Sequence, residues 1–132
     1  MKYWIILLFS FLFAHANASC DPVKIELNSE NSIELGFSIS RTSLDDCNDC
    51  FAIEIDAPEF YEEIPLASIT AWNYLDGELL SSSSTPVKNL ANSIEFFGIF
   101  MKSSEYEYKV MFTFSGENTI TGCDTYSFYY ST

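Results

Sequence analysis

Apolar and polar side chains alternate with a period of two residues along most of this chain. The first alternation covers residues 23–27, and a second one, Ile33–Ile39, follows the turn-forming segment Asn28–Ser32. Because successive side chains of a β-strand point to opposite faces, this period predicts two half-buried antiparallel strands joined by that turn. A third alternation, Phe51–Ile55, predicts a strand that Pro58 ends.

The middle of the chain is less regular. Residues 59–65 are an acidic and aromatic connection, and Leu66–Leu75 predicts a strand with apolar side chains on both faces. Asp76-Gly77 predicts a type I′ hairpin turn, since both central residues of that turn need positive φ. The return strand would be Glu78–Leu80, and Ser81–Ser84 after it predicts a flexible polar tract.

Three further strands are predicted in the C-terminal part. Ser93–Met101 is rich in Phe, and Tyr106–Phe114 is the most regular alternation of the chain. Thr119–Tyr130 would return with aromatic side chains on one face. Seven or eight short strands separated by turn signals predict an all-β fold. The expected architecture is an antiparallel β-sandwich of immunoglobulin-like or fibronectin-III-like topology, stabilised by disulfides.

The first 18 residues have a different character. Lys2 precedes the apolar run Trp4–Ala14, and Ala16-Asn17-Ala18 offers small residues at a cleavage site. This is typical of a secretory signal peptide, and the run is shorter than the roughly 20 residues of a membrane span. We therefore expect a signal peptide at 1–18 and one domain at 19–132. The mature protein would be exported, periplasmic or extracellular, without stable membrane insertion.

The chain is strongly acidic. It has 19 Asp and Glu against six Lys and Arg, a formal net charge of −13, and loss of Lys2 with the signal peptide would make this −14. Such a charge repels nucleic acid and attracts basic proteins or cations, although it also serves solubility alone. The charge argues against nucleic acid as a partner. Beyond solubility, it predicts a protein partner that is basic.

Four cysteines follow the signal peptide: Cys20, Cys47, Cys50 and Cys123. In an oxidising compartment an even number predicts disulfides, here two, and three pairings are open. If consecutive strands are antiparallel, all four cysteines lie at one end of the sandwich, within reach of one another. We favour cross-links from Cys20 and Cys123 to the loop of Cys47 and Cys50. The alternative joins Cys47 to Cys50 and Cys20 to Cys123.

The same cysteine loop is acidic and supplies the candidate residues for binding a partner or a cation. With one neighbour of the last cysteine they are Asp45, Asp46, Asn48, Asp49 and Asp124. Ca²⁺ prefers such oxygen ligands, but the Gly and the final Glu of an EF-hand loop are absent. A solvated acidic loop is the simpler interpretation. The binding hypothesis is one acidic patch at that end of the sandwich.

Several enzyme chemistries find little support. The C-x-x-C spacing of Cys47 and Cys50 occurs in thiol oxidoreductases and zinc sites, but surrounding acids disfavour a reactive thiolate and export favours a disulfide. His15 lies in the signal peptide, so the mature protein has no histidine for base, nucleophile or metal chemistry. Acidic neighbours such as Glu54 and Asp56 are better explained as outward strand positions than as a glycosidase pair. We expect no enzyme activity and no cofactor.

Tyr129, Lys109 and Met111 fall on the strand face opposite the core stripe. Exposed Tyr among acids is typical of recognition surfaces. The leading hypothesis is a small exported acidic binding module that engages a basic protein, as an inhibitor, immunity protein or accessory subunit. The alternatives are a calcium- or carbohydrate-binding β-sandwich module and a structural subunit of a surface assembly.

Overall fold

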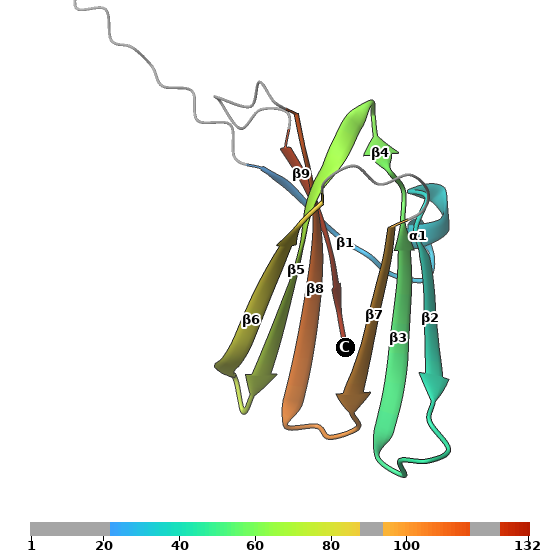
Figure 1. Ribbon diagram of the computed structural model, residues 1–132, viewed down its shortest axis with the longest axis vertical. Helices are drawn as coiled ribbons and strands as arrows, with labels where there is room; N and C mark the ends of the chain where they lie inside the picture. The colour runs from blue at the N-terminus through green and yellow to red at the C-terminus, as the bar shows by residue number, and fades with distance from the viewer. Residues whose placement is uncertain (1–21, 88–93, 117–124) are drawn as a thin grey trace, which may run out of the picture.

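The computed structural model describes residues 22–87, 94–116 and 125–132. Within these ranges the chain consists almost wholly of β-strands, with one short helix (Figure 1). The elements in chain order are β1 (Val23–Glu26), α1 (Asn31–Glu34), β2 (Ser38–Ser43), β3 (Cys50–Ala57), β4 (Phe60–Tyr61), β5 (Ile64–Leu75), β6 (Glu78–Pro86), β7 (Ile94–Met101), β8 (Tyr106–Ser115) and β9 (Thr125–Ser131).

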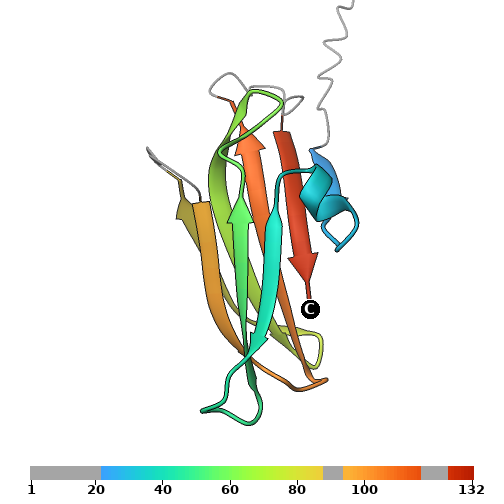
Figure 2. The same cartoon turned by 90° about the vertical axis from the view of Figure 1, so that its right-hand side faces the viewer.

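These strands form two sheets. The large sheet has the order β1-β9-β8-β5-β4, with β6 also paired to β5, and the small sheet has the order β2-β3-β7. Figure 2 shows the small sheet in front of the large one. In this arrangement β3 and β7 face β5, β8 and β9, as strands B and E face C, F and G in immunoglobulin-like domains. The fold is an immunoglobulin-like antiparallel β-sandwich, as the strand pattern predicts.

Phenylalanine side chains dominate the core between the sheets. Phe112, Phe114 and Phe128 of the large sheet are 0% exposed. The ring of Phe37, which lies just before β2, packs against all three, with ring centroids 5.2–6.3 Å apart. From the small sheet Ile55, also 0% exposed, completes the same cluster. Truncating one such Phe to Ala costs about 3–5 kcal/mol.

The strand expected at 33–39 is wrong in its first half, where the chain forms α1. Asn28 explains the turn, because its Oδ1 accepts hydrogen bonds from the backbone N–H groups of Glu30 and Asn31, at 2.8 and 2.9 Å. An Asn side chain that binds the following backbone starts a turn in place of a strand. Gly36, at φ 83°, then redirects the chain, and Ile33 is left 78% exposed.

The helix changes which strands pair. The hairpin expected between the first two strands does not form, because the chain passes through α1 from the large sheet to the small one. Instead β1 pairs with β9, and this pair is parallel, whereas β2 pairs antiparallel with β3. The first strand therefore lies beside the last strand, and the two strands that the alternation suggested as neighbours belong to different sheets.

The hairpin turn in the middle of the chain is confirmed. Asp76 and Gly77 have φ of 50° and 80°, as a type I′ turn requires. The serine tract after it is not a flexible tract, because it belongs to β6 and pairs with β5 along its length. The serine hydroxyls add side-chain hydrogen bonds to this pairing, since Asn73 Nδ2 donates to Ser81 Oγ at 2.9 Å. The first residues of the expected last strand, 119–124, lie outside the described residues.

Candidate functional site

The loop between β2 and β3 is closed by a disulfide between Cys47 and Cys50, whose Cα atoms are 5.3 Å apart. Backbone hydrogen bonds support the tight turn, since Cys47 N–H donates to the carbonyl of Leu44 at 3.3 Å and Cys50 N–H to that of Cys47 at 3.2 Å. The favoured cross-links from this loop to Cys20 and Cys123 are therefore wrong. The alternative pairing contained the observed bond, and Cys20 and Cys123 lie outside the described residues.

The disulfide loop, residues 44–49, does not lie at the same end as the start of the domain. Lys102 N–H donates to the carbonyl of Asp49 at 2.6 Å, so the loop lies beside the turn between β7 and β8. The starts of β1 and β9 are at the other end, where Val23 pairs with Tyr126 (Figure 1). The expectation that consecutive strands alternate in direction failed at α1, and with it the argument that four cysteines gather at one end.

The acidic side chains of the disulfide loop are all exposed. They are Asp45, Asp46 and Asp49, with the amide of Asn48 among them. The fifth candidate, Asp124, lies outside the described residues, and β9, which begins at Thr125, starts at the far end of the sandwich. The loop therefore does not share a patch with the start of β9.

A second acidic group lies on the outer face of the small sheet. Glu54 and Asp56 of β3 and Glu95 of β7 each place a carboxylate oxygen within 4.8 Å of the others, and we call them the carboxylate cluster. Asp56 and Glu95 are directly opposite each other across the two strands. Like charges directly opposite in a sheet lower its stability. No hydrogen bond or ion pair with these carboxylates is found in the described part of the chain.

Sequence reasoning found only part of this cluster. The alternation correctly placed Glu54 and Asp56 on an outward strand face, and the structure confirms that neither is a core residue. Glu95 was missed, because its position beside Asp56 depends on the register between two strands about 40 residues apart in the chain. The Phe-rich segment that predicted β7 gave no information on which strand it would join.

Next to the carboxylate cluster, β7 carries a row of exposed apolar side chains. Phe97, Ile99 and Met101 are 59, 59 and 50% exposed, and we call them the β7 stripe. They alternate with Phe96 and Phe100, which face the core. The Phe96 and Phe100 rings approach so closely over Gly98 that a Cβ there would lie 2.5 Å from the nearest Phe100 atom. The inner side of β7 is thus filled, and its outer side is apolar and open.

The three features join into one continuous surface. The β7 stripe begins next to Glu95 of the carboxylate cluster. It ends at Met101, which is opposite Cys50 at the end of the disulfide loop. The surface is therefore acidic at both ends and apolar in between, and we call it the acid–apolar–acid strip. At about 3.3 Å per residue, the six steps from Glu95 to Met101 span about 20 Å.

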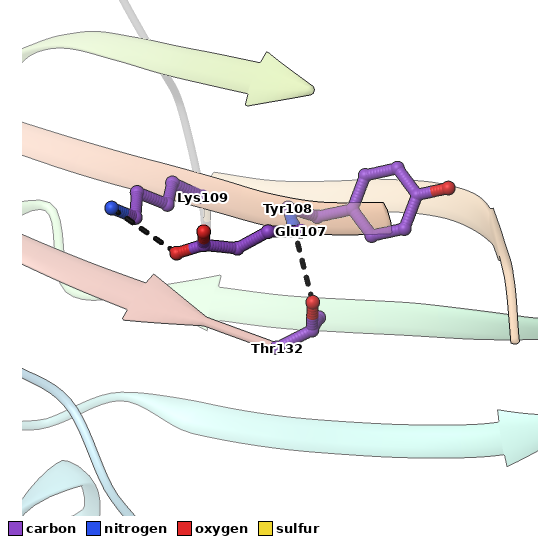
Figure 3. Close-up of polar contacts among 4 residues, drawn as sticks. All are labelled: Glu107, Tyr108, Lys109 and Thr132. Carbon is purple, nitrogen blue, oxygen red and sulfur yellow. Dashed lines mark hydrogen bonds and ion pairs between the residues drawn. The ribbon is translucent and has the colours of Figure 1, made fainter. Parts of the chain in front are cut away.

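The outer face of the large sheet is different. Lys109 Nζ lies 3.2 Å from Glu107 Oε1 on the same face of β8 (Figure 3) and 5.4 Å above the Tyr74 ring. The hydrogen bond and the charge of Glu107 raise the pKa of Lys109 above 10.5. The expected grouping of Lys109, Met111 and Tyr129 on this face is confirmed, since Met111 is directly opposite Tyr129. On this face the lysine therefore has an acidic partner and an aromatic partner within the same sheet.

The described residues also line two hollows, and Met101 of the β7 stripe is in the wall of the second one. A cleft of about 730 Å³ opens where α1 and β2 meet β9, and its walls include Asn28, Ile39 and Tyr130. A second hollow of about 430 Å³ lies beside the β7–β8 turn and is lined by Arg41 and Lys102.

Arg41 and Lys102, the two cations that line the second hollow, both contact residues nearby in the fold. The Arg41 guanidinium is 3.8 Å from the centre of the Phe51 ring, and Lys102 Nζ donates to Ser43 Oγ at 3.1 Å. No described ion pair joins either cation to the acids of the disulfide loop. In the described part of the chain these acids are therefore not neutralised by either cation.

No protein-family model and no curated protein matches this chain. A solved structure, the CARDB domain of a Pyrococcus furiosus protein in complex with di-metal ions, is 13% identical, with 83% of this chain and 79% of that chain covered. Its TM-score is 0.24, a likeness too weak to carry an argument. Among the described residues, no helix has the length and apolar character that crossing a membrane would need.

Proposed function

We propose that this protein is an exported, non-catalytic binding module that engages a basic protein through the acid–apolar–acid strip. The observation that carries the proposal is the β7 stripe, three large apolar side chains at least half exposed and side by side on one strand. Scattered exposed apolar residues need no explanation, but a contiguous exposed row marks an interaction surface.

The charges give the chemistry of the partner. The carboxylate cluster brings together three acids of β3 and β7, of which Asp56 and Glu95 are directly opposite, at a cost to the stability of the sheet. A Lys or Arg side chain placed among them would relieve this repulsion and make charge-assisted hydrogen bonds. The acids of the disulfide loop supply a second point of attraction about 20 Å along the strip. A basic partner with an apolar centre fits both.

Export and the absence of catalysis are parts of the proposal with their own support. Residues 1–18 have the composition of a signal peptide, and Cys47 and Cys50 form a disulfide of the kind that persists in oxidising compartments. After residue 18 the sequence contains no histidine. The proposed role is that of an inhibitor, an immunity-type protein or an accessory subunit.

The experiment that tests this function is affinity capture from cell-envelope extract with the mature, oxidised protein. It compares the natural protein with Ile99→Glu in the β7 stripe and with Met111→Glu on the outer face of the large sheet. The proposal predicts one basic protein that the natural protein and the Met111 variant retain and the Ile99 variant loses. Equal recovery by all three proteins, or loss in the Met111 variant alone, contradicts it.

A carbohydrate-binding module is the second candidate function. The cleft between α1, β2 and β9 favours it, since an aromatic ring, Tyr130, lies in a wall together with amide and hydroxyl groups. Such a combination is common in sites for small polar ligands. This candidate predicts a glycan that binds the natural protein and not Tyr130→Ala, with Ile99→Glu unaffected. A glycan array followed by titration of the best sugar decides it.

A further inference from the structure

We infer that the partner binds as an extended segment that adds a strand to the free edge of β7, with a basic residue at each end and apolar residues between. This inference rests on the proposed function and specifies how the strip is used. It names the bonds, the length of the segment and the pattern of its side chains.

The first observation is that β7 has an open edge. Within the described residues β7 pairs with β3 alone, so alternate backbone N–H and C=O groups on its other side lack a strand partner. At the end of the strand Met101 N–H donates to the Tyr108 hydroxyl at 3.2 Å, so the open edge covers the residues before Met101. Proteins usually protect such an edge with a bulge, a proline or charged side chains, lysine above all. The other long edges have these features: β6 ends in Pro86 and faces an irregularity in β5, and β2 carries Arg41. Ile94–Met101 has no bulge and no proline, and its one charged side chain is Glu95 near the start of the strand.

The second observation is that β7 is held in regular pairing with β3 along its whole length. All eight of its residues are in continuous register with β3, from Ala57 opposite Ile94 to Cys50 opposite Met101. The Phe96 and Phe100 rings, stacked with centroids 6.4 Å apart, fill the space above Gly98 on the inner side. An edge that is already ordered loses little conformational entropy when a strand is added to it.

The third observation is the order of side chains along the outer face. An added strand would lie about 4.8 Å from β7, with alternate side chains beside the outward residues of β7. Those residues are Glu95, Phe97, Ile99 and Met101, and the disulfide loop follows. The complementary segment has a basic residue, three apolar residues at alternate positions and a second basic residue. This pattern occupies about nine residues.

Charge complementarity also decides which occupant fits. A second copy of this chain would bring its own Glu95 to the edge, where the pattern needs a base. A basic segment from another protein satisfies the carboxylate cluster, the β7 stripe and the disulfide loop at once. We therefore assign the edge to a basic, alternating segment of a different protein.

The test uses the mature, oxidised protein and a synthetic nonapeptide, acetyl-Lys-Thr-Val-Thr-Val-Thr-Ile-Thr-Lys-amide. Two further peptides of the same sequence carry N-methyl groups on alternate residues, one on the odd positions and one on the even positions. In a strand, only one of these two sets has its N–H groups directed at β7. Isothermal titration calorimetry gives the three affinities, and hydrogen exchange shows which amides of the protein become protected.

The inference predicts that one N-methylated peptide binds about tenfold more weakly, or not at all, while the other binds like the parent. Protection appears at residues 94–101. Ile99→Glu weakens the parent peptide by about tenfold or more, Ile99→Thr weakens it less, and Met111→Glu has no effect. Ile99 is largely exposed, so the variants are expected to fold, and their melting curves provide the check.

Several results overturn the inference. They are no binding of the parent peptide, equal effects of the two N-methylated peptides, protection on the large sheet, or a dimer of the free protein that Ile99→Glu dissolves, which would make a second copy the occupant. The capture experiment distinguishes failure of this inference from failure of the proposed function. If Ile99→Glu still abolishes capture of the partner while the two N-methylated peptides bind alike, the strip binds a partner but not by strand addition.

Discussion

The two outer faces of this sandwich differ in how their side chains are satisfied. On the large sheet Lys109 pairs with Glu107 at 3.2 Å and lies over Tyr74, and Thr70 Oγ1 is 3.0 Å from Ser84 Oγ. On the small sheet three carboxylates lie within 4.8 Å of one another, beside three apolar side chains that are at least half exposed. Both faces belong to strands of the same core.

This difference indicates which outer face has charges and apolar side chains without partners in the described part of the domain. Pairs within a face contribute little stability when exposed, but they leave nothing for a partner to satisfy. Clustered like charges and exposed apolar area both carry a cost that a partner removes. We therefore propose that the outer face of the small sheet, and not that of the large sheet, is the surface that a partner covers.

The largest effect is expected for Ile99→Glu, which places a charge in the middle of the β7 stripe. Partner affinity should fall by at least about 30-fold, or about 2 kcal/mol, because central apolar residues carry most interface energy. Met111→Glu is the matched control on the other face and should change the affinity little. Biolayer interferometry with the captured partner measures both. The reverse order would show that the comparison of the faces is wrong.

Replacing Cys47 and Cys50 by Ser should cost about 2 kcal/mol of unfolding free energy, the loop-closure value for so short a loop. It should also weaken partner binding, because one acidic end of the strip becomes less ordered. Urea unfolding of the oxidised variant gives the first quantity. A variant as stable as the natural protein would contradict a structural role for this bond.

Peptide mapping of the same samples settles the second pairing. With Cys47 joined to Cys50, Cys20 and Cys123 are the two cysteines left. We therefore expect a Cys20–Cys123 peptide.

Removing one charge should have opposite effects on stability on the two faces. Glu95→Gln relieves repulsion with Asp56 and should raise the unfolding free energy by about 0.2–1 kcal/mol while it weakens partner binding. Glu107→Gln breaks the pair with Lys109 and should lower stability by less than about 1 kcal/mol, with partner binding unchanged. Urea unfolding at low salt measures both changes. Equal signs would break the comparison.

Alkaline pH gives a smaller test of the large-sheet face. The pKa of Lys109 is raised by its hydrogen bond with Glu107, so the charged lysine stabilises the folded state. This contribution is complete below pH 10.5 and is lost as pH rises through the folded-state pKa. Because the side chain is 38% exposed, the loss should be a few tenths of a kcal/mol and vanish in high salt. Lys109→Met is the control that should lack it.

Calcium should produce the smallest effect. A dedicated site with a Kd of about 10 μM would add about 2.7 kcal/mol at 1 mM calcium and raise Tm by several degrees. The carboxylate cluster offers one carboxylate oxygen from each of three residues within 4.8 Å of one another. A calcium site uses six to eight oxygen ligands. We expect a shift below about 1 °C by differential scanning fluorimetry. A large shift would favour the calcium-binding alternative.

The period-two pattern predicted most of the strands because it reports which side chains share a face of one strand. It placed Phe112 and Phe114 in the core, and the Asp76-Gly77 dipeptide gave the hairpin turn. It could not show that Asn28 would bind the backbone after it and replace half a strand by α1. That local competition between side chain and backbone also reversed the expected direction of the following strands.

The sequence pattern also could not predict which strands pair with each other. Nothing local to Glu95 indicates that it lies opposite Asp56, since this depends on which distant strand packs beside β7 and in which register. The direction of the strands after α1, and not their register, misplaced Cys47 and Cys50, which were expected at the end where β1 and β9 begin. The acidic loop was recognised from sequence, but its connection to an apolar stripe on a neighbouring strand was visible only in three dimensions.

The most direct test of the account is amide hydrogen exchange of the mature protein with and without its captured basic partner. The account predicts that protection on binding is confined to residues 94–101 and the adjoining disulfide loop, with the outer strands of the large sheet unchanged. Protection along residues 68–75 and 107–113, with none in β7, would contradict it.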